Sequence, residues 1–470
     1  EQGRAFVLEN SDEKVLSRQD SPPKIFGQAP TLTSLFGREK ETKILLKHLN
    51  SGKQIHIRGL PGIGKSTLAR SLAELVAKEG QEVRWAGIDA YTDVSMLMQR
   101  FGFETEALLD VSAYVSLFIN QPETILIIDD IQAVSDRHKD AFTQFFSSLG
   151  EMNIPTILIG REPQPFTTEG PVLSLGPLET KQAIQLLGEE MGDEKRIEIA
   201  ERLGGHPLAI LMYDDSTPLP EESDDVRTYV KQVVLGEESA DVHDAMPPFI
   251  MLPFPVPAER MAIPDDVSLL DEHALLRWIP NDLSMEMQHL VRNVCRSNLS
   301  DEELDKLHLE SIEHWSQYSD SFSSIAEFHH RIKRGEQDIG SVLSQQATVL
   351  MHERSGSFAT LLDEAVVLQP ENIELIGLAT QHALNRAELN IAKEYLSKAE
   401  DDSKLDHLRL QIAHFEGKKG AIESFEESYQ ALEDPNEKLR FQLSVLSRAI
   451  DDLVGENTSE QLNLLERMML

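Results

Sequence analysis

The sequence predicts a multidomain chain in which one α/β domain with a parallel sheet is followed by mainly helical units. Two apolar runs, residues 124–128 and 154–159, have the pattern of parallel strands that are buried on both faces. A glycine-rich turn at residues 59–64 joins a third short strand to a helix. From residue 301 onward the apolar residues recur only at helical spacing.

Length and charge limit the classes of protein to which the chain can belong. A chain of 470 residues predicts several hydrophobic cores. Its 80 acidic and 44 basic side chains give a net charge of −36, which argues against a nucleic-acid surface spread over the molecule. The single cysteine, Cys295, and the lack of a long apolar run favour a cytoplasmic protein without a membrane partner. Because the chain starts with Glu and stops inside a helical pattern, we expect it to be part of a longer protein.

The glycine-rich turn has the form Gly59-x4-Gly64-Lys65-Ser66, with a β-prone run before it and a helical pattern after it. This context predicts a phosphate-binding loop whose backbone N–H groups surround a polyphosphate. Lys65 is expected to reach the β- and γ-phosphates, and the Ser66 hydroxyl to ligate Mg²⁺. The nucleotide-binding residues predicted here are Gly59, Pro61, Gly62, Ile63, Gly64, Lys65, Ser66 and Thr67.

Charged residues follow two of the predicted strands. Asp129 and Asp130 come directly after the first apolar run, and Arg161 follows the second. Ligands of open α/β sheets lie at the carboxyl ends of the strands, so we expect these side chains beside the loop. Asp129 is predicted to hold Mg²⁺ through water, Asp130 to orient or deprotonate the attacking water, and Arg161 to sense the γ-phosphate. The alternatives are a helix cap for the carboxylates and a surface position for the arginine.

The segment Phe36-Gly37-Arg38 precedes a predicted helix over residues 42–49, upstream of the loop. Related ATPases usually contact adenine from such a segment. Phe36 and Gly37 are therefore candidates for a base pocket, and Arg38 for a phosphate or partner contact. The alternative is a turn before the helix with a packed phenylalanine. Residues 3–8 are predicted as a strand left from an upstream winged-helix domain, or else as an arm.

Helical units follow from residue 179. A hairpin expected near residues 279–287 among helices is typical of a winged helix, and 15 acidic against 6 basic residues in 221–300 favour packing against the core over DNA reading. Helix pairs at 371–385 and 387–399, and at 403–416 and 418–431, indicate an α-solenoid of tetratricopeptide type. With 33 acidic and 16 basic residues, its concave face is expected to bind a protein partner or signal ligand. The predicted domains are an N-terminal arm (1–34), a P-loop parallel-sheet ATPase core (35–178), a helical lid (179–220), a winged-helix-like unit (221–300) and a C-terminal α-solenoid of TPR-like repeats (301–470).

The order of these motifs resembles the signal-transducing P-loop ATPases of the STAND class, which includes the NACHT and NB-ARC groups. The resemblance runs from residue 35 to about 295 and includes the turn Gly205-His206-Pro207 and His289. It implies that Pro207 lies over the base and sugar of the nucleotide, and that His289 contacts the β-phosphate of ADP. The acidic residue that follows this histidine in the family is Leu290 here, which departs from the family pattern.

The resemblance implies a switch that is closed with ADP and open with ATP. A ligand on the repeats would loosen the packing, ATP would replace ADP, the open form would assemble into a homo-oligomer, and hydrolysis would reset it. Two alternatives remain. One is an archaeal-initiator-like AAA+ ATPase that binds DNA, for which a basic winged helix is expected; the other is a scaffold with a structural nucleotide. In the switch, DNA binding is expected only if a domain precedes residue 1.

Overall fold

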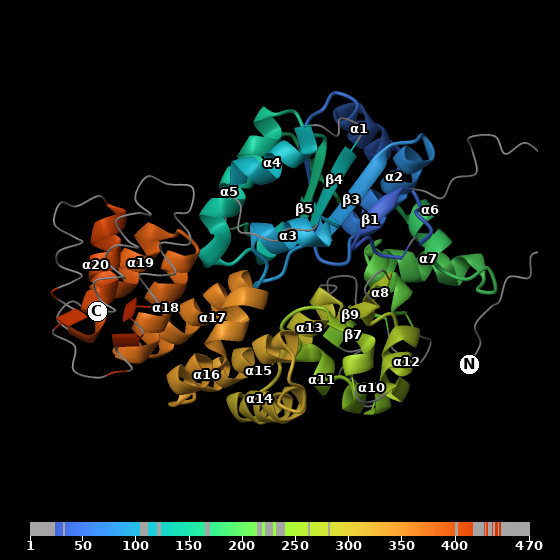
Figure 1. Ribbon diagram of the computed structural model, residues 1–470. Coiled ribbons are helices and arrows are strands. Elements are labelled where there is room, and N and C mark those ends of the chain that lie inside the picture. The colour runs from blue at the N-terminus through green and yellow to red at the C-terminus, as the bar shows by residue number, and fades with distance from the viewer. Residues whose placement is uncertain are drawn as a thin grey trace, which may run out of the picture.

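The computed structural model describes most of residues 24–416 in three parts (Figure 1): an α/β domain, a winged-helix unit beside it and a helical array that continues from the winged-helix unit and contacts the α/β domain. No helix in these described segments is long and apolar enough to cross a membrane. The strand predicted at residues 3–8 and the helices predicted from residue 418 lie outside the described part. The described residues are 24–416 without 32, 104–110, 120–123, 165–169, 214–218, 221–228, 232–239, 262–263, 281–282 and 400–402, together with a few residues between 427 and 442.

The α/β domain is built on one sheet of six parallel strands in the order β1-β3-β4-β5-β2-β6. All carboxyl ends of the strands therefore meet at the same edge. β5 lies between the strand before the glycine-rich loop, β2, and the strand before the paired carboxylates, β4. The strands are β1 (Ile25–Gly27), β2 (Ile55–Arg58), β3 (Glu82–Gly87), β4 (Thr124–Asp129), β5 (Thr156–Gly160) and β6 (Val172–Ser174).

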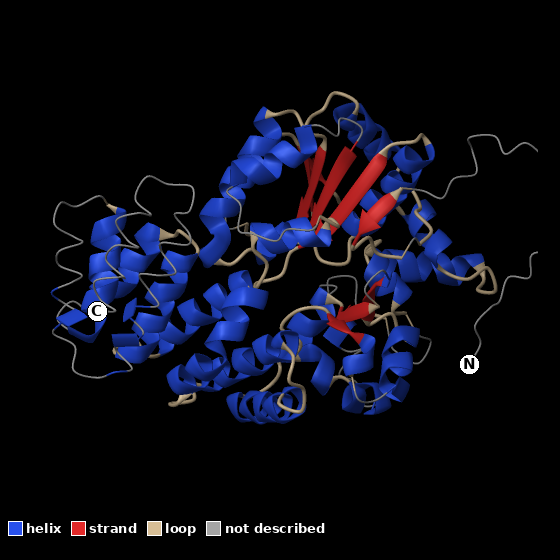
Figure 2. Cartoon of the chain, in the orientation of Figure 1, coloured by secondary structure: helices blue, strands red, loops and turns tan. Residues whose placement is uncertain are grey.

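Helices cover both faces of this sheet (Figure 2). Successive side chains of β4 point to opposite faces, so Ile125 and Ile127 join one core and Leu126 and Ile128 another. The first core includes residues of α1 and α2, and the second includes residues of α3, α4 and α5. These helices are α1 (Glu39–Leu49), α2 (Lys65–Lys78), α3 (Val94–Arg100), α4 (Val111–Ile119) and α5 (Lys139–Glu151).

Strand β1 corrects the predicted start of the core at residue 35. It pairs with β3, with Ile25 opposite Val83 and Gly27 opposite Trp85. A strand of three residues has no alternation to read, which is why the pattern gave no sign of it. After β6 the chain forms the predicted helical lid from α6 (Thr180–Ala183), α7 (Asp193–Arg202) and α8 (Pro207–Leu211).

The winged-helix unit has an antiparallel sheet in the order β7-β9-β8. The hairpin predicted near residues 279–287 is formed by β8 and β9, in which Arg277 lies opposite Glu286. Helix α13 begins at His289, directly after β9. The elements of the unit are α10 (Ala240–Ala245), α11 (Pro247–Ile250), β7 (Val256–Pro257), α12 (Pro264–Glu272), β8 (Leu276–Ile279), β9 (Ser284–Met287) and α13 (His289–Arg296).

The C-terminal part is a right-to-left array of paired helices in the view of Figure 1. The predicted pair at 371–385 and 387–399 corresponds to α18 and α19, and the small residue Ala392 is fully buried between helices. The fold class predicted from the sequence is confirmed. The helices are α14 (Asp301–Trp315), α15 (Ser321–Arg334), α16 (Ile339–Glu353), α17 (Ser355–Leu368), α18 (Ile373–Asn385), α19 (Leu389–Ser397) and α20 (Asp406–Phe415).

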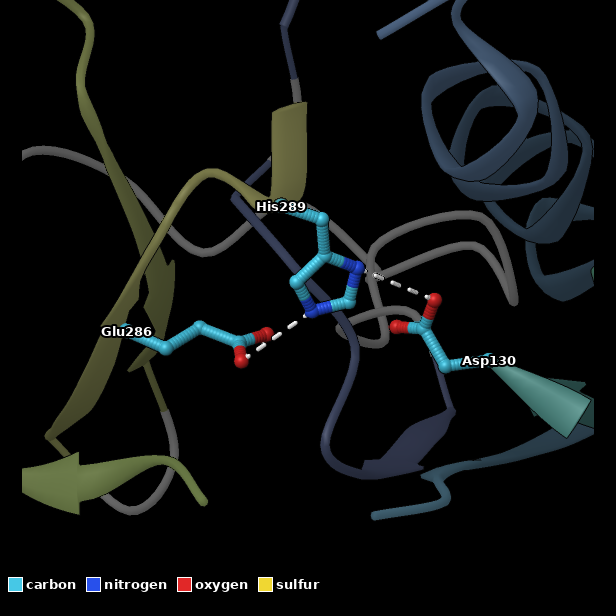
Figure 3. A group of neighbouring side chains, drawn as sticks. All are labelled: Asp130, Glu286 and His289. Atoms are coloured by element: carbon cyan, nitrogen blue, oxygen red, sulfur yellow. Dashed lines mark hydrogen bonds and ion pairs between the residues drawn. The ribbon is translucent and has the colours of Figure 1, made fainter. Parts of the chain in front are cut away.

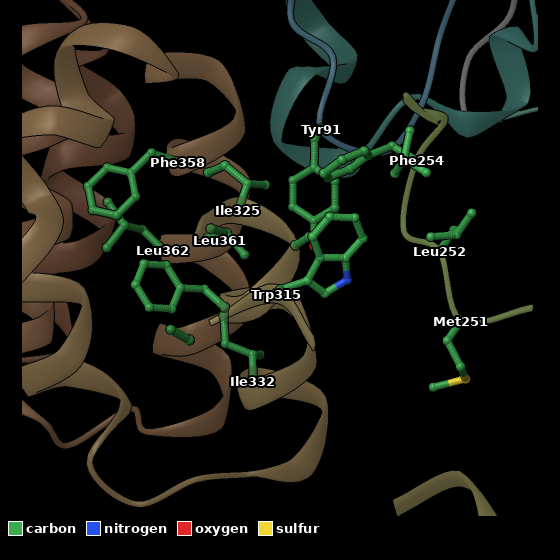
Figure 4. Close-up of a cluster of buried hydrophobic side chains, with 14 of the residues drawn as sticks. Tyr91, Met251, Leu252, Phe254, Trp315, Ile325, Ile332, Phe358, Leu361 and Leu362 are labelled. Carbon is green, nitrogen blue, oxygen red and sulfur yellow. The ribbon is translucent and has the colours of Figure 1, made fainter. Parts of the chain in front are cut away.

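The winged-helix unit and the helical array share one hydrophobic core (Figure 4). Trp315 of α14 and Phe254 of the winged-helix unit belong to it, and Tyr91 of the α/β domain joins it. The Tyr91 and Phe254 rings meet edge to face at 5.8 Å, and the Tyr91 hydroxyl lies 2.6 Å from Nδ1 of His329. Because an apolar core is closely packed, we expect a shift of the array to be transmitted to the winged-helix unit.

Candidate functional site

The glycine-rich loop turns into α2 as the sequence predicts. Gly64 precedes the helix with a φ of +93°, and Gly62 has a φ of +75°. A Cβ atom on Gly62 would lie 2.7 Å from the Leu208 Cβ, so this position favours glycine on two counts. The Lys65 ammonium donates to the carbonyls of Gly59 and Leu60, at 3.1 and 2.9 Å. Its pKa is lowered by burial, although Asp129 and Asp130 act against that effect.

A cavity of about 410 Å³ lies over this loop. Two domains line it, because residues of the α/β domain and lid face residues of the winged-helix unit across it. From the sequence-predicted site it includes Pro61, Gly62, Gly64, Lys65, Ser66, Thr67, Asp129, Asp130, Arg161, Pro207 and His289. The chain also contributes Pro30, Thr31, Thr33, Gln132, Leu208, Leu211, Asp271, Ala274, Leu276, Arg277, Trp278, Gln288 and Leu290. Gly59 and Ile63 belong to the loop but do not line the cavity, and Ile63 is buried in the core of the α/β domain.

The segment 36–38 occupies a different place from the one predicted. Phe36, Gly37 and Arg38 do not line the cavity. The buried Arg38 guanidinium donates to the carbonyl of Gly176 at 2.7 Å and to that of Ile63 at 3.4 Å, which ties the backbone behind the loop together. Its Nη2 is thus directed at protein carbonyls, and its Nη1 lies 3.3 Å from Oε1 of Glu41. The upstream residues that reach the cavity belong to the segment 30–33.

Ser66 and Asp129 meet at the base of the cavity. The Ser66 hydroxyl donates to Oδ2 of Asp129 at 2.7 Å, and Asp129 is almost fully buried. Hydroxyl and carboxylate oxygens are the ligands that Mg²⁺ prefers, so this pair fits the ion that the sequence predicts. Arg161 directly follows β5, the strand between β2 and β4, and also lines the cavity.

Asp130 has a left-handed backbone, with a φ of +58° and a ψ of +37°. Residues other than glycine adopt this conformation at a cost of about 1–3 kcal/mol, and such strain concentrates at functional sites. The Gln132 side-chain amide donates to Oδ1 of Asp130 at 2.9 Å, and the Asp130 N–H donates to Oδ1 of Asp129 at 2.9 Å. These bonds hold the two carboxylates beside each other at the end of β4.

A residue that the sequence analysis did not select, Arg277, contacts both carboxylates. Its Nη2 lies 2.9 Å from Oδ2 of Asp129, and its Nη1 lies 2.5 Å from Oδ2 of Asp130. Nη1 also lies 3.3 Å from Oε1 of Glu286, the residue opposite in the hairpin. The winged-helix unit thus places a positive charge on the carboxylates of the α/β domain. A basic residue in the hairpin of an acidic unit is the one signal in the sequence that points to this role.

His289 completes the network (Figure 3). Its Nδ1 lies 3.5 Å from Oδ1 of Asp130, and its Nε2 lies 3.3 Å from Oε2 of Glu286. Burial alone would lower the pKa of His289, but the charges of Glu286 and Asp130 outweigh it and raise the pKa above its usual value. Both ring nitrogens face carboxylates, so the doubly protonated ring suits the site. His289, Glu286 and Asp130 offer metal-ligand atoms within 4.8 Å of one another, but Arg277 already contacts both carboxylates.

The carboxylates differ in how firmly they keep their charge. Burial would raise the pKa of Asp130, but the charges of Arg277 and His289 hold it below the ordinary value. The pKa of Glu286 is lowered in the same way, against its burial, chiefly by His289. Burial and the neighbouring Asp130 raise the pKa of Asp129. The site therefore needs a cation to keep both aspartates ionised.

The lid is bonded directly to the phosphate-binding loop. Nε2 of His206 donates to the carbonyl of Pro61 at 3.0 Å, and the Leu208 N–H donates to the carbonyl of Gly62 at 3.2 Å. Gly205 has a φ of +66°, and a Cβ atom there would lie 2.1 Å from the carbonyl oxygen of Leu178. The glycine therefore lets the turn pass close to the core and brings Pro207 to the cavity.

A second set of polar contacts joins the α/β domain to the helical array. Nη1 of Arg386 lies 3.1 Å from Oδ2 of Asp93, and both side chains are almost fully buried. Arg137 forms an ion pair with Glu388, and Nε2 of His138 donates to the carbonyl of Gly356 at 3.0 Å. The α/β domain is thus held from two sides, by the winged-helix hairpin and by α17 to α19.

Comparison with known proteins agrees with this architecture. Residues 55–185 match the family model of AAA, the ATPases associated with various cellular activities. The crystal structure of a STAND protein with a tetratricopeptide repeat sensor from Pyrococcus horikoshii aligns with 94% of this chain and 78% of its own chain, with a TM-score of 0.53 and 16% identity. At this identity the likeness establishes the fold, which confirms the STAND resemblance at that level.

Two curated relatives match parts of this chain. A cytochrome c biogenesis ATP-binding export protein of Bordetella parapertussis is 39% identical over 69 residues, which are 14% of this chain and 31% of the relative. A DNA repair protein RadA of Aquifex aeolicus is 22% identical over 183 residues, which are 35% of this chain and 40% of the relative. The chain thus spans only a minor share of the length of the curated relatives that it matches.

Proposed function

Because the chain shares the fold of a STAND protein and its residues 55–185 match the AAA ATPases, we propose that it is an ATP-binding and ATP-hydrolysing signal-transduction switch. The form that is closed around ADP would open when ATP replaces it. The open form would assemble into a homo-oligomer and act on assembly or transcription through protein partners, with the activating signal received on the helical repeats.

One observation carries this proposal: the cavity over the phosphate-binding loop is walled by two domains. Lys65 and Ser66 lie on one side, and Arg277 and His289 of the winged-helix unit lie on the other. A nucleotide in this cavity has to contact both, so its terminal phosphate can bias how the domains pack. A ligand shifts an equilibrium only if it binds the two states with different affinity, and this cavity offers such a difference.

The residues of the loop and sheet edge suit hydrolysis. Lys65 would bind the β- and γ-phosphates, and the backbone N–H groups from Gly62 to Thr67 would hold the polyphosphate. Mg²⁺, when bound by Ser66 and Asp129, would neutralise charge on the phosphate oxygens. Asp130 would accept a proton from the attacking water, and Arg161 would stabilise the charge that develops on the γ-phosphate. Pro207 would pack on the base and sugar.

The closed packing suggests how a signal would reach the site. The repeats hold the α/β domain through Arg386 and Arg137, while their core continues into the winged-helix unit that carries Arg277. A protein or ligand that binds the array and strains these contacts would free the hairpin. We therefore place the signal-receiving surface on α14 to α20.

Single-turnover hydrolysis of ATP tests the enzymatic part. The wild type and the Asp130→Asn variant are mixed in excess over ATP, and phosphate release is followed. We expect the variant to be slower by about 10²–10⁴-fold, the usual contribution of a general base. Equal rates would contradict hydrolysis at this site and favour a scaffold with a structural nucleotide. His273→Ala, a change at an exposed histidine in the turn after α12, serves as a control that should retain the wild-type rate.

A further inference from the structure

The geometry around Arg277 points to a role beyond closure. We infer that its guanidinium is an internal substitute for the divalent cation: in the closed form it occupies the carboxylates of Asp129 and Asp130, and it excludes a metal ion from them until the winged-helix hairpin withdraws. The inference rests on the proposed nucleotide site, but not on the assembly of the open form.

Arg277 contacts the same Asp129 carboxylate that is expected to bind the metal ion. Oδ2 of Asp129 accepts a hydrogen bond from Ser66 at 2.7 Å and from Nη2 of Arg277 at 2.9 Å. A divalent ion bound directly to the Ser66 and Asp129 oxygens, without the bridging water predicted from the sequence, would lie about 2–2.5 Å from each. It would therefore stand almost in contact with the guanidinium, and the two positive charges would repel each other in a buried site.

Arg277 also compensates the negative charge of the carboxylates around it. Asp129, Asp130 and Glu286 bring three carboxylates together, and Arg277 contacts all three. The ammonium of Lys65 is directed at the carbonyls of Gly59 and Leu60. Arg277, helped by protonated His289, thus supplies the compensation that a metal ion would otherwise give to the two aspartates. With the guanidinium removed, this cluster becomes a strong oxygen site for a divalent ion.

The guanidinium of Arg277 also lies beside a second cavity into which it can move. This second cavity, of about 180 Å³, shares several lining residues with the first. Asp130, Arg277 and His289 line both cavities, so the guanidinium stands in the wall between them. Because Arg277 belongs to β8, a small movement of the hairpin toward or away from the sheet edge is enough to break its contacts.

The consequence is a coupling between metal and conformation. The closed form would retain a nucleotide with little help from a divalent ion, whereas tight metal-nucleotide binding would require the hairpin to leave. The order of events becomes hairpin release, then metal-dependent binding of the triphosphate. Arg277 is in this sense a specificity-determining residue, since it decides which form of the nucleotide the site accepts.

The test uses Mn²⁺ as the probe, with the full chain and no nucleotide. Electron paramagnetic resonance measures the free ion during a titration of wild type, Arg277→Gln and Arg292→Gln. Arg292 is a matched control, because its Nη1 lies 3.9 Å from Oε2 of Glu286 and, within the part of the chain that the structure describes, it forms no ion pair with either aspartate. We expect Arg277→Gln to bind one Mn²⁺ at least about ten-fold more tightly than the other two proteins. Adding Asp129→Asn to Arg277→Gln should abolish the gain.

Equal Mn²⁺ affinities in wild type and Arg277→Gln would overturn the inference, and so would an equal gain in Arg292→Gln. If Arg277→Gln does not fold, Arg277→Lys takes its place, because a single ammonium cannot bridge two carboxylates as a planar guanidinium does. In that case an affinity unchanged from wild type overturns the inference. Neither result depends on hydrolysis or assembly, so a failure here is separate from a failure of the proposed switch.

Discussion

Nε2 of His206 lies 3.0 Å from the carbonyl oxygen of Pro61, which fastens the lid to the phosphate-binding loop. The other ring nitrogen accepts from the Ala209 N–H at 3.4 Å, so the ring acts in its neutral form with the proton on Nε2. The histidine between the glycine and proline of this turn is thus a support for the loop, while Pro207 faces the cavity.

His206→Ala is therefore expected to weaken nucleotide binding. The variant loses a hydrogen bond to the loop, worth about 0.5–1.5 kcal/mol, and leaves the carbonyl of Pro61 without that donor. We expect the Kd of a fluorescent ADP analogue to rise by up to about ten-fold, since 1.4 kcal/mol is a factor of ten. His273→Ala, which changes an exposed histidine in the turn after α12, should leave the Kd unchanged. An equal Kd for wild type and His206→Ala would refute a supporting role.

Arg386→Gln is expected to loosen the contact between the α/β domain and the array. Removal of one partner leaves the buried Asp93 carboxylate without this charge, at a cost of up to about 3–5 kcal/mol in a buried pair. Hydrogen exchange at the start of α3 should therefore become faster. Lys306→Gln removes an exposed ion pair with Glu310 and should have no such effect. Unchanged exchange in α3 would show that this ion pair does not hold the closed form.

The contact between the α/β domain and the helical array contains buried histidines, which make it sensitive to acid. Burial lowers the pKa of His138 to about 4 and that of His382 to about 3, and Arg386 and Arg137 act in the same direction on both. Asp93 opposes the shift. The neutral histidines give their full stabilisation when the pH is above the ordinary histidine pKa, near 6.5. Stability is lost as pH falls below about 6.5 toward the lowered pKa of each histidine in the folded protein.

Thermal unfolding measured from pH 7.5 to 4.5 checks this dependence. The unfolding temperature should fall steadily below pH 6.5, and His138→Gln should reduce the slope. A slope that is the same in wild type and His138→Gln would show that this histidine remains accessible to protons in the folded state.

His289 is expected to act in the opposite direction at the winged-helix hairpin. The charges of Glu286 and Asp130 raise its pKa above the ordinary value, against the effect of burial. The closed contact is therefore strongest below about pH 6.5, and it is lost as pH rises through the raised pKa. Release of a fluorescent ADP analogue should become faster from pH 6 to 9 in the wild type, and His289→Gln should show little such change. A release rate independent of pH in the wild type would contradict this role.

Much of the site could be predicted because its chemistry is local in sequence. The loop at 59–67 and the carboxylates after β4 each lie within a few consecutive residues, and both line the cavity. The helix pair α18 and α19 also follows from a local repeat. These predictions need only the strand order, which places the carboxyl ends of all strands at one edge.

The remaining parts depend on contacts between distant residues. Arg277 meets Asp130 across 147 positions of the chain, and its place as a basic residue in an acidic unit does not identify that partner. Arg38 is the opposite case. Its position near the loop suggested a ligand contact, but its guanidinium donates a hydrogen bond to the carbonyl of Gly176, which lies 138 residues away in the chain. Tertiary pairing of charged groups decides both cases, and no periodic pattern encodes it.

The mass of the protein in solution shows whether nucleotide governs a closed and an open form. Light scattering is recorded with ADP and then with a non-hydrolysable ATP analogue and Mg²⁺, for wild type, Arg277→Gln and Lys65→Ala. We expect growth of the particle with the analogue, more readily in Arg277→Gln, and none in Lys65→Ala. A wild-type and an Arg277→Gln particle that both keep the same mass with ADP and with the analogue would contradict a nucleotide-gated switch.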